Sequence, residues 1–405
     1  MCHMNTGEVS ATKSAGVVGV VGAGAMGSGI AQVAAQAGHE VYLVDAIAGA
    51  ARAARERLAG TLAGLAAKGK LSAADADAAA ARIHAVDAVA DLPACEIVVE
   101  AIRELFADKV DLFTALAATQ PANTIFATNT SSLDITEIAE QVAHPERERV
   151  AGMHFFNPAA IMKLVEVVAA RQSDPKVLDR ITALARAWGK TPVRCTSTPG
   201  FIVNRVARPY YGEGQRIVEG GYANAATVDW ALKHLAGFRM GPMELTDLIG
   251  HDVNYAVGES VWKQTGKDPR YEPTLIQRTL VDNGDLGRKT GKGFFTYDAD
   301  GKPTDAVVDE DLARRLVGGP IETDPVNRTL AMLVNEAVDL VARGEASAED
   351  VDIAMQLGTN YPKGPIQWGH EIGFERVHTW LRTLDAAYPG GRYRPSPALL
   401  DGTVR

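Results

Sequence analysis

The feature that most constrains this chain is a glycine turn near its start, in "VVGVVGAGAMGSGIAQVAAQAGHEVYLVD". The turn follows a short β-branched run and opens an alanine-rich stretch with helical spacing. A strand, a tight turn and a helix in this order present helix N-terminal N–H groups to a pyrophosphate. The stretch therefore predicts a dinucleotide-binding site. The predicted cofactor-binding residues of this turn are Gly22, Gly24, Ala25, Met26 and Gly27.

Asp45 ends the next predicted strand, roughly 20 residues past the glycines, where such folds place an acidic residue. Its carboxylate can accept hydrogen bonds from the 2′-hydroxyl of an adenosine ribose and would repel a 2′-phosphate. Arg52, the nearest arginine, is separated from the turn by a full helical stretch. NAD is therefore expected as the cofactor, rather than NADP.

The first half of the chain alternates strand-like and helix-like segments, which is typical of a doubly wound, mostly parallel sheet. The segment 46–81 is expected to form two helices with a break near 68–70. The predicted strands are 17–21, 41–44, 97–99, 124–127, 150–154 and 164–168.

The second half is predicted to be helical and to contain an internal repeat. A shift of 123 residues, applied without a gap, takes Asn204-Arg205 to Asn327-Arg328, Glu213 to Glu336 and Gly241-Pro242 to Gly364-Pro365. The fold class expected is an α/β Rossmann-type domain followed by two similar all-α domains. The predicted boundaries are a disordered tail (1–14), the NAD-binding domain (15–198), a first helical copy (199–296), a linker (297–320) and a second copy (321–405).

Composition excludes several classes of function. A net charge of −9 argues against nucleic acid or an anionic membrane as a partner. The three cysteines are scattered without metal-ligand spacing, which fits a reducing compartment and argues against a metal site. The polar start lacks the apolar region of a secretory signal, and no apolar run reaches the ~18 residues of a membrane span. A cytoplasmic enzyme is expected.

A histidine and a glutamate mark the predicted chemistry. Glu166 lies inside an apolar run that is predicted to be a buried strand, where an ionised carboxylate needs a partner. His154 closes the preceding strand, and a turn beginning at Asn157-Pro158 can bring the two together. A histidine can take a proton from an alcohol while its carboxylate partner fixes the tautomer. A purely structural hydrogen bond at a strand turn explains the pattern equally well. His144, His234 and His251 lack such a partner pattern and are expected on the surface or in packing.

Six motifs in this order resemble the L-3-hydroxyacyl-CoA dehydrogenase family and cover residues 17 to about 295. They are "GVVGAGAMGSGIAQVAAQAGHEVYLVD", "VVEAIRE" (98–104), "TNTSSL" (128–133), "HFFNP" (154–158), "KLVEVV" (163–168) and "TPGFIVNR" (198–205). The resemblance implies NAD-dependent, reversible oxidation of an L-3-hydroxyacyl-CoA to a 3-ketoacyl-CoA, in fatty acid, aromatic (phenylacetate) or short-chain acyl-CoA metabolism. It also implies a substrate cleft between the Rossmann-type and helical domains.

The resemblance assigns roles to particular residues. His154 corresponds to the general base and Glu166 to its partner. Ser131 and Asn204 fall where the family positions the substrate and the base, and the predicted catalytic set is therefore His154, Glu166, Ser131 and Asn204. Glu104 and Asn129 fall where the family contacts the nicotinamide half, and Asn157 is expected to support the substrate site. Candidate phosphate contacts for coenzyme A are Arg52, Lys68, Lys70 and Lys109, although a solvated helical face explains these residues nearly as well.

The second helical copy resembles that of longer 3-hydroxybutyryl-CoA or 3-hydroxyadipyl-CoA dehydrogenases with tandem C-terminal domains. Glu244 becomes Gln367 and Asp247 becomes His370 at the repeat shift, so a structural duplicate is expected rather than a second active site. The chain is expected to be a homodimer, or a monomer if the second copy replaces the partner surface. Two alternatives are a 2-hydroxymethyl-acid dehydrogenase of the 6-phosphogluconate type, which would need a lysine near Asn204, and a non-catalytic, crystallin-like NADH-binding protein.

Overall fold

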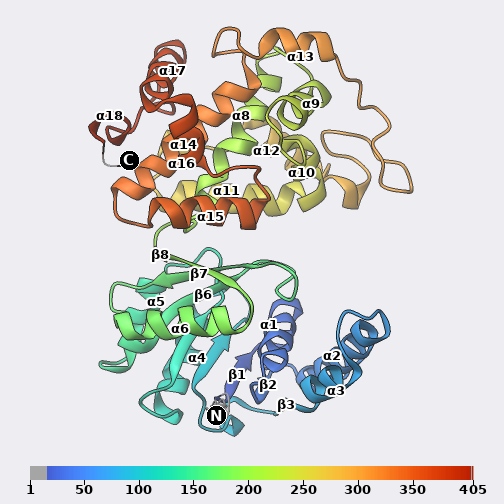
Figure 1. The fold of residues 1–405 in the computed structure, drawn as a ribbon, viewed down its shortest axis with the longest axis vertical. Coiled ribbons are helices and arrows are strands. Elements are labelled where there is room, and N and C mark those ends of the chain that lie inside the picture. The colour runs from blue at the N-terminus through green and yellow to red at the C-terminus, as the bar shows by residue number, and fades with distance from the viewer. Residues whose placement is uncertain (1–15, 403, 405) are drawn as a thin grey trace, which may run out of the picture.

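A computed structural model describes residues 16–402 and 404 and contains one eight-stranded sheet below a helical region (Figure 1). The predicted N-terminal tail (1–14) lies outside the described residues. The strands are β1 (Val18–Val21), β2 (Val41–Val44), β3 (Ile83–Ala85), β4 (Ile97–Glu100), β5 (Ile125–Thr128), β6 (Val150–Phe155), β7 (Leu164–Ala169) and β8 (Thr191–Thr196).

The strands lie in the order β3-β2-β1-β4-β5-β6-β7-β8. Strands β1 to β6 are parallel, whereas β7 pairs antiparallel with β6 and parallel with β8. The first six strands thus have the order of a dinucleotide-binding sheet, with the connections changing direction between β1 and β4, where ligands bind in such folds. The predicted Rossmann-type α/β fold is confirmed; β3 and β8 were not predicted.

Helices cover both faces of the sheet, and the predicted helical pair in 46–81 is present. A serine N-cap begins its second helix: Ser72 Oγ accepts from the N–H of Asp75 at 3.0 Å. The helices of this part are α1 (Ala25–Gln36), α2 (Ala50–Ala67), α3 (Ala73–Ala81), α4 (Phe106–Thr119), α5 (Ile135–Gln141) and α6 (Pro175–Ala187), with short 3-10 turns η1 (Val89–Asp91) and η2 (Glu146–Arg149).

The helical region contains the predicted repeat. The shift of 123 residues takes both ends of α10 to those of α16, and both ends of α11 to those of α17. The helices are α7 (Val203–Val206), α8 (Arg208–Glu219), α9 (Ala225–Leu235), α10 (Pro242–Ile249), α11 (His251–Gln264), α12 (Leu275–Asp282), α13 (Glu310–Leu316), α14 (Pro325–Ala342), α15 (Ala348–Thr359), α16 (Pro365–Ile372), α17 (Phe374–Ala387) and α18 (Ala398–Asp401), with 3-10 turns η3 (Pro269–Tyr271) and η4 (Arg288–Thr290). None of the helices in residues 16–402 is long and apolar enough to cross a membrane.

The two copies meet through reciprocal ion pairs. Arg205 of the first copy donates to Glu336 of the second at 2.5 Å, and Arg328 of the second donates to Glu213 of the first at 2.8 Å. The repeat shift exchanges these two pairs, so the contact has the self-complementary character of a two-fold interface, although both halves lie in one chain.

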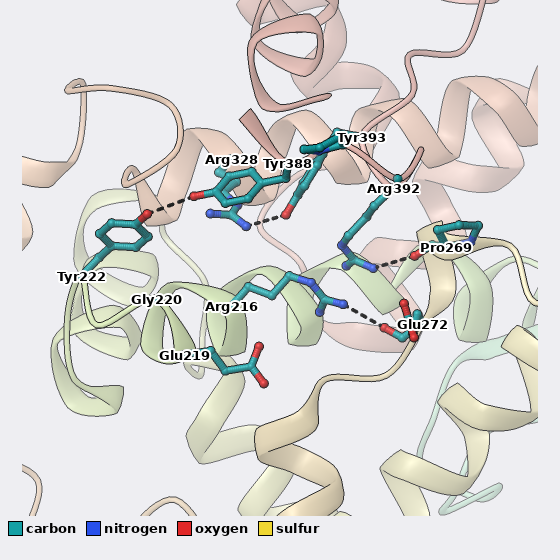
Figure 2. Close-up of a pocket in the computed structure, with 12 residues that line it drawn as sticks. Arg216, Glu219, Gly220, Tyr222, Pro269, Glu272, Arg328, Tyr388, Arg392 and Tyr393 are labelled. Atoms are coloured by element: carbon teal, nitrogen blue, oxygen red, sulfur yellow. Dashed lines mark hydrogen bonds between the residues drawn. The ribbon is translucent and has the colours of Figure 1, made fainter. Parts of the chain in front are cut away.

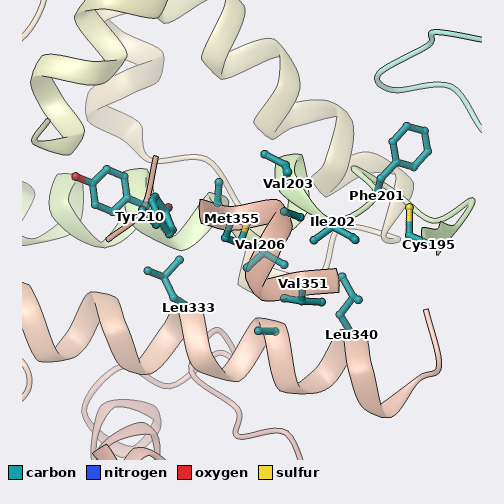
Figure 3. Close-up of a cluster of buried hydrophobic side chains, with 14 of the residues drawn as sticks. Cys195, Phe201, Ile202, Val203, Val206, Tyr210, Leu333, Leu340, Val351 and Met355 are labelled. Atoms are coloured by element: carbon teal, nitrogen blue, oxygen red, sulfur yellow. The ribbon is translucent and has the colours of Figure 1, made fainter. Parts of the chain in front are cut away.

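Helix α14 is the buried centre of this contact. Its side chains Leu333 and Leu340 pack in one apolar cluster with Val206 of α7 and Val351 and Met355 of α15 (Figure 3). Helix α15 also packs against β7 and β8, so the second copy contacts the sheet domain as well as the first copy.

The predicted linker is more structured than expected. Before it, Asp247 fixes the glycine-rich segment by accepting hydrogen bonds from the N–H groups of Phe294 and Phe295 at 2.9 and 3.0 Å. Within 297–320, α13 packs on α9 and buries Ala313 completely. Helix α13 is therefore packed into the helical region, whereas residues 302–311 before its centre are exposed.

Candidate active site

Of the three glycines of the turn, Gly24 is the one beside which the protein leaves space for a ligand. Gly22 has φ +107, and a Cβ there would lie 2.3 Å from the carbonyl oxygen of Ala101. A Cβ at Gly27 would lie 1.8 Å from the carbonyl oxygen of Gly22, whereas one at Gly24 would meet nothing within 4 Å. Gly22 and Gly27 are thus required by packing, and Gly24 leaves room beside the chain.

The N-terminus of α1 is suited to an anion. Gly24 is its N-cap and contributes no side-chain cap, and the first turn carries no acidic residue. The first N–H groups of a helix have no intrahelical partner, and the helix dipole favours negative charge there. Together with the open space at Gly24, this arrangement fits a dinucleotide pyrophosphate.

A cavity of about 900 Å³ extends from this turn across the end of β2. Asp45 lines it and is held by the N–H groups of Ala23 and Ile47, at 2.6 and 2.8 Å. These bonds fix the carboxylate at the edge of the cavity, where it can face a ribose. Apolar side chains that also line the cavity, and can flank an adenine ring, are Val44, Ile47, Val89 and Ile102.

Glu104 organises the loop after β5. Its Oε1 accepts from the N–H groups of Ser131 and Ser132 at 3.0 and 3.2 Å and from the hydroxyl of Thr130. Burial raises the pKa of Glu104, but Lys109 and these hydrogen bonds outweigh burial, so its pKa lies below its ordinary value. Glu104 is therefore an ionised anchor beside the predicted nicotinamide subsite.

Lys109 corrects one prediction. It was expected to contact a phosphate of coenzyme A, but its side chain is only 1% exposed. Its Nζ lies 2.6 Å from Glu100 and 3.2 Å from Glu104. A lysine enclosed between two carboxylates has no free face for a phosphate, so its role is to hold Glu104. Sequence reasoning also missed Glu100, although the buried glutamate in "VVEAIRE" needs a cationic partner.

His154 and Glu166 meet across the antiparallel pair β6 and β7, where they are directly opposite in register. His154 Nδ1 lies 2.6 Å from Glu166 Oε2, with side chains 7% and 0% exposed. A carboxylate can only accept, so Nδ1 carries the proton and Nε2 remains an acceptor. The reversal of β7, which was not predicted, produces this opposition.

The second oxygen of Glu166 reaches the helical region. Glu166 Oε1 accepts from the N–H groups of Ile202 and Val203 at 3.1 and 2.9 Å, at the start of α7. Phe156 and Phe201 flank the imidazole, with ring centroids 4.6 and 5.8 Å from it. The carboxylate thus fixes the histidine and the junction between the two regions together.

The remaining predicted residues lie around this junction. Asn204 Nδ2 is 3.5 Å from the carbonyl oxygen of Ser131, across the two regions. Asn129 accepts from the N–H of Phe155 at 2.9 Å and thereby ties the end of β5 to β6 beside His154. Asn157 is exposed in the loop after β6. Gln264, which sequence reasoning missed, donates to the carbonyl oxygen of Ser132 at 2.9 Å from α11.

The basic candidates for coenzyme A are separate from these contacts. Arg52 lies on α2, and Lys68 and Lys70 lie in the turn before α3. All three are exposed, and Arg52 lies 3.8 Å from Asp87. Their exposure leaves them accessible to an anionic ligand.

Lys190 is a buried cation that the sequence did not predict. Its Nζ donates to the carbonyl oxygens of Ala159 and Met162, the latter at 2.8 Å, and so holds the loop between β6 and β7. Burial, with a smaller effect from Lys163, lowers the pKa of Lys190 to about 8. The shape of the loop that follows His154 therefore depends on a lysine at the start of β8.

A second histidine–carboxylate pair was also missed. His251 was expected to lack such a partner, yet its Nε2 lies 2.7 Å from Asp247 and both side chains are fully buried. The same carboxylate accepts from Tyr297 at 2.8 Å as well as from the backbone of the glycine-rich segment. Because this pair faces packed protein, it anchors the segment.

Comparison with known proteins relates most of the chain to one family. Residues 17–198 match the model of the 3-hydroxyacyl-CoA dehydrogenase NAD binding domain, and residues 200–297 and 325–402 match that of the C-terminal domain. The chain is 39% identical to the 3-hydroxyadipyl-CoA dehydrogenase of Escherichia coli, over 94% of this chain and 96% of that protein. It is also 39% identical to human mitochondrial hydroxyacyl-coenzyme A dehydrogenase, over 69% of this chain and 90% of that protein. The crystal structure of an Escherichia coli 3-hydroxybutyryl-CoA dehydrogenase superposes with a TM-score of 0.86 at 37% identity, covering 96% of this chain and 98% of that one.

Proposed function

This chain belongs to the 3-hydroxyacyl-CoA dehydrogenase family, and we propose that it oxidises L-3-hydroxyacyl-CoA thioesters reversibly with His154 as the general base. The observation that carries this proposal is the buried pair of His154 and Glu166 at the junction of the NAD-binding sheet and the helical region. A base is needed there because oxidation of an alcohol releases a proton as well as a hydride.

His154 Nε2 takes the proton of the substrate 3-hydroxyl. Glu166 keeps the Nδ1 proton in place and stabilises the imidazolium that forms, as carboxylates do beside catalytic histidines. The glycine turn and Asp45 would hold NAD, which when bound would supply the acceptor for the hydride of C3. In the reverse direction the protonated His154 returns the proton to the 3-keto oxygen.

Ser131 and Asn204 are proposed to position the substrate. The hydroxyl and the amide can hydrogen-bond the 3-oxygen and the thioester carbonyl without competing for the proton that His154 removes. Support comes from their meeting across the junction, with Glu104 fixing the loop of Ser131. Asn157 is proposed to support the same site from the loop after β6.

Coenzyme A is proposed to contact the helical pair of α2 and α3. Arg52, Lys68 and Lys70 are exposed there, and the cofactor and substrate both carry phosphates that attract guanidinium and ammonium groups. Lys109 is excluded from this set because of its burial.

The second helical copy is proposed to replace a partner subunit, so that a single chain is active. The reciprocal pairs of Arg205 with Glu336 and Arg328 with Glu213 support this, because such contacts are typical of a two-fold subunit interface. Light scattering coupled to size-exclusion chromatography should give the mass of one chain; an obligate dimer would contradict the proposal.

NADH consumption with acetoacetyl-CoA tests the function. An active enzyme oxidises NADH at a rate proportional to enzyme concentration, whereas a crystallin-like protein binds NADH without oxidising it. A 6-phosphogluconate-type enzyme would leave the thioester unchanged and turn over a hydroxy acid. Comparing 3-hydroxybutyryl, longer 3-hydroxyacyl and 3-hydroxyadipyl thioesters then identifies the preferred acyl group, since the similar proteins carry names with different acyl groups.

A further inference from the structure

A cavity of about 430 Å³ lies between the two helical copies, away from the proposed active site (Figure 2). Three guanidinium groups line it: Arg216 from α8 of the first copy, Arg328 from α14 of the second, and Arg392 from the segment after α17. Three tyrosines also line it, and the hydroxyls of Tyr222 and Tyr388 are 3.0 Å apart.

One buried carboxylate forms ion pairs with two of these arginines. Glu213 is fully buried and accepts from Arg328 at 2.8 Å and from Arg392 at 2.6 Å. The hydrogen bonds of Arg216 go instead to the backbone carbonyl oxygens of Gly212 and Glu272, at 3.4 and 3.1 Å. Three guanidinium groups thus line the cavity, and the one buried carboxylate beside them, Glu213, pairs with two of the three.

Arg216 and Arg392 lie close together. A Cβ at Gly212 would be 3.6 Å from Nη1 of Arg216 and 2.9 Å from Nη2 of Arg392, so both guanidinium groups lie over the same glycine. Burial, and then repulsion by Arg392, lower the pKa of Arg216 to about 10 against the opposing effect of Glu213. Arg392 is compensated by Glu213, whereas Arg216 donates to backbone carbonyl oxygens, so Arg216 is the less compensated of the two charges.

The internal repeat supplies a comparison within the molecule. The related cluster is built on Glu336, which binds Arg205 and Arg270. There the position of Arg216 is occupied by Asp339, which lies 3.2 Å from Arg270. The position of Tyr222 is occupied by Glu345, which pairs with Arg205.

The two clusters therefore differ in charge at corresponding positions. In the related cluster the buried Arg205 and Arg270 face Glu336, Asp339 and Glu345, and the exposed Arg343 also pairs with Asp339 at 2.8 Å. The other has three arginines and one buried carboxylate, and it lines the cavity of about 430 Å³, whereas the cavity beside Arg270 and Tyr271 of the related cluster measures only about 30 Å³. Where the related cluster has Asp339 and Glu345, this one has the cationic Arg216 and the neutral Tyr222, both of which are hydrogen-bond donors.

Two further carboxylates stand at the rim. Glu219 and Glu272 are both exposed, and Glu219 Oε1 accepts from the N–H of Ile276 at 2.8 Å. Solvent screens exposed charges far more than buried ones. The rim carboxylates therefore reduce the attraction for an anion but do not neutralise the inner wall.

We propose that this cavity binds a phosphate-bearing small molecule, with Arg216 as its principal cationic contact. Guanidinium groups bind phosphate through charge-assisted, often paired hydrogen bonds, and the hydrogen-bonded hydroxyls of Tyr222 and Tyr388 leave one further neutral donor. The volume exceeds that of a phosphate group alone, and the tyrosine rings provide an apolar surface for an organic body. The ligand would join the two copies at their interface and stabilise them against each other.

The test is calorimetric titration of the full chain, saturated with NADH to fill the dinucleotide site, with inorganic phosphate and separately with AMP. In Arg216→Asp, which installs the residue of the related cluster, and in Arg216→Gln, the Kd should rise at least about tenfold. Arg171→Ala, a change at an arginine whose side chain is 78% exposed in the sheet domain, should leave the Kd unchanged.

Each outcome decides the proposal. Loss of binding in both Arg216 variants, with normal unfolding temperatures and unchanged activity, supports the site. Binding of AMP but not inorganic phosphate identifies an organic phosphate, and binding of both identifies the phosphate group as sufficient. Absence of binding at millimolar concentrations in the unmodified chain, or equal binding in the Arg216 variants, overturns the proposal. Activity with acetoacetyl-CoA reports separately on the proposed function.

Discussion

Replacing Glu166 with glutamine should test the division of roles at the proposed active site. The side chain is isosteric, and its amide oxygen can still accept from the N–H groups of Ile202 and Val203. The amide nitrogen then faces His154 Nδ1, which lies 2.6 Å from the carboxylate in the structure. Because an amide N–H only donates, Nδ1 must become the acceptor and the ring proton moves to Nε2.

A histidine protonated at Nε2 cannot take the substrate proton. The loss expected for a general base is roughly 10²–10⁴-fold in kcat, equivalent to about 3 to 5 kcal/mol of barrier. The assay is NADH formation from 3-hydroxybutyryl-CoA, with NADH binding measured by fluorescence. Because the two residues act as one unit, Glu166→Gln should cost little more when His154 is already alanine.

A matched control is Glu140→Gln, an amide substitution at a side chain that is 42% exposed in the same domain. It should keep full activity. If Glu166→Gln retains activity within a few-fold of the unmodified chain while folding normally, Glu166 does not set the tautomer of His154, and the reasoning fails.

Three further predictions follow from the cofactor turn and the buried charges. Gly24→Ala should weaken NAD binding without lowering the unfolding temperature, because a Cβ there meets nothing within 4 Å of the protein. Gly27→Ala should destabilise the fold, because its Cβ would lie 1.8 Å from a carbonyl oxygen. Equal unfolding temperatures for the two variants would contradict this. Lys109→Met should lower stability by roughly 3–5 kcal/mol by leaving the buried carboxylate of Glu100 unpaired; a free energy of unfolding equal to that of the unmodified chain would contradict this role. Burial raises the pKa of Glu213, but its arginine partners lower that pKa to about 2, below the ordinary 4.5. The contribution of Glu213 to the free energy of unfolding is therefore present above about pH 4.5 and is lost as the pH falls toward 2. Glu213→Gln should destabilise the chain more at pH 7 than at pH 3 in denaturant titrations.

The sequence predicted those parts of the fold and site that depend on local pattern. The glycine turn, Asp45 and the helical break near Lys68 follow from short-range rules of strands, turns and caps. The pairing of His154 with Glu166 was anticipated because a turn beginning at Asn157-Pro158 could bring them together, although the antiparallel direction of β7 was not predicted. The internal repeat was visible because its spacing is free of gaps.

The features that were missed depend on contacts between distant segments. Lys109 resembled a surface cation because its helix pattern does not show that Glu100 and Glu104 close over it. His251 acquires its buried environment only when the glycine-rich segment folds back on Asp247. For these residues the burial of charge depends on tertiary contacts that the local pattern does not show.

The contacts between the two helical copies could not be predicted from local sequence pattern either. The repeat was visible in the sequence, but the exchange of arginine and glutamate partners between copies was not. Only the folded chain shows that Arg216 and Asp339, which are equivalent in the repeat, face different surroundings. The two clusters, related by the repeat, thus have different electrostatic properties.

The most direct test of the central claim is a single-turnover measurement with His154→Ala. The variant is mixed with NADH and acetoacetyl-CoA, and NADH binding and NADH oxidation are followed in the same sample. The account predicts normal NADH affinity and an oxidation rate lowered roughly 10²–10⁴-fold. Oxidation at the rate of the unmodified chain would contradict His154 as the general base.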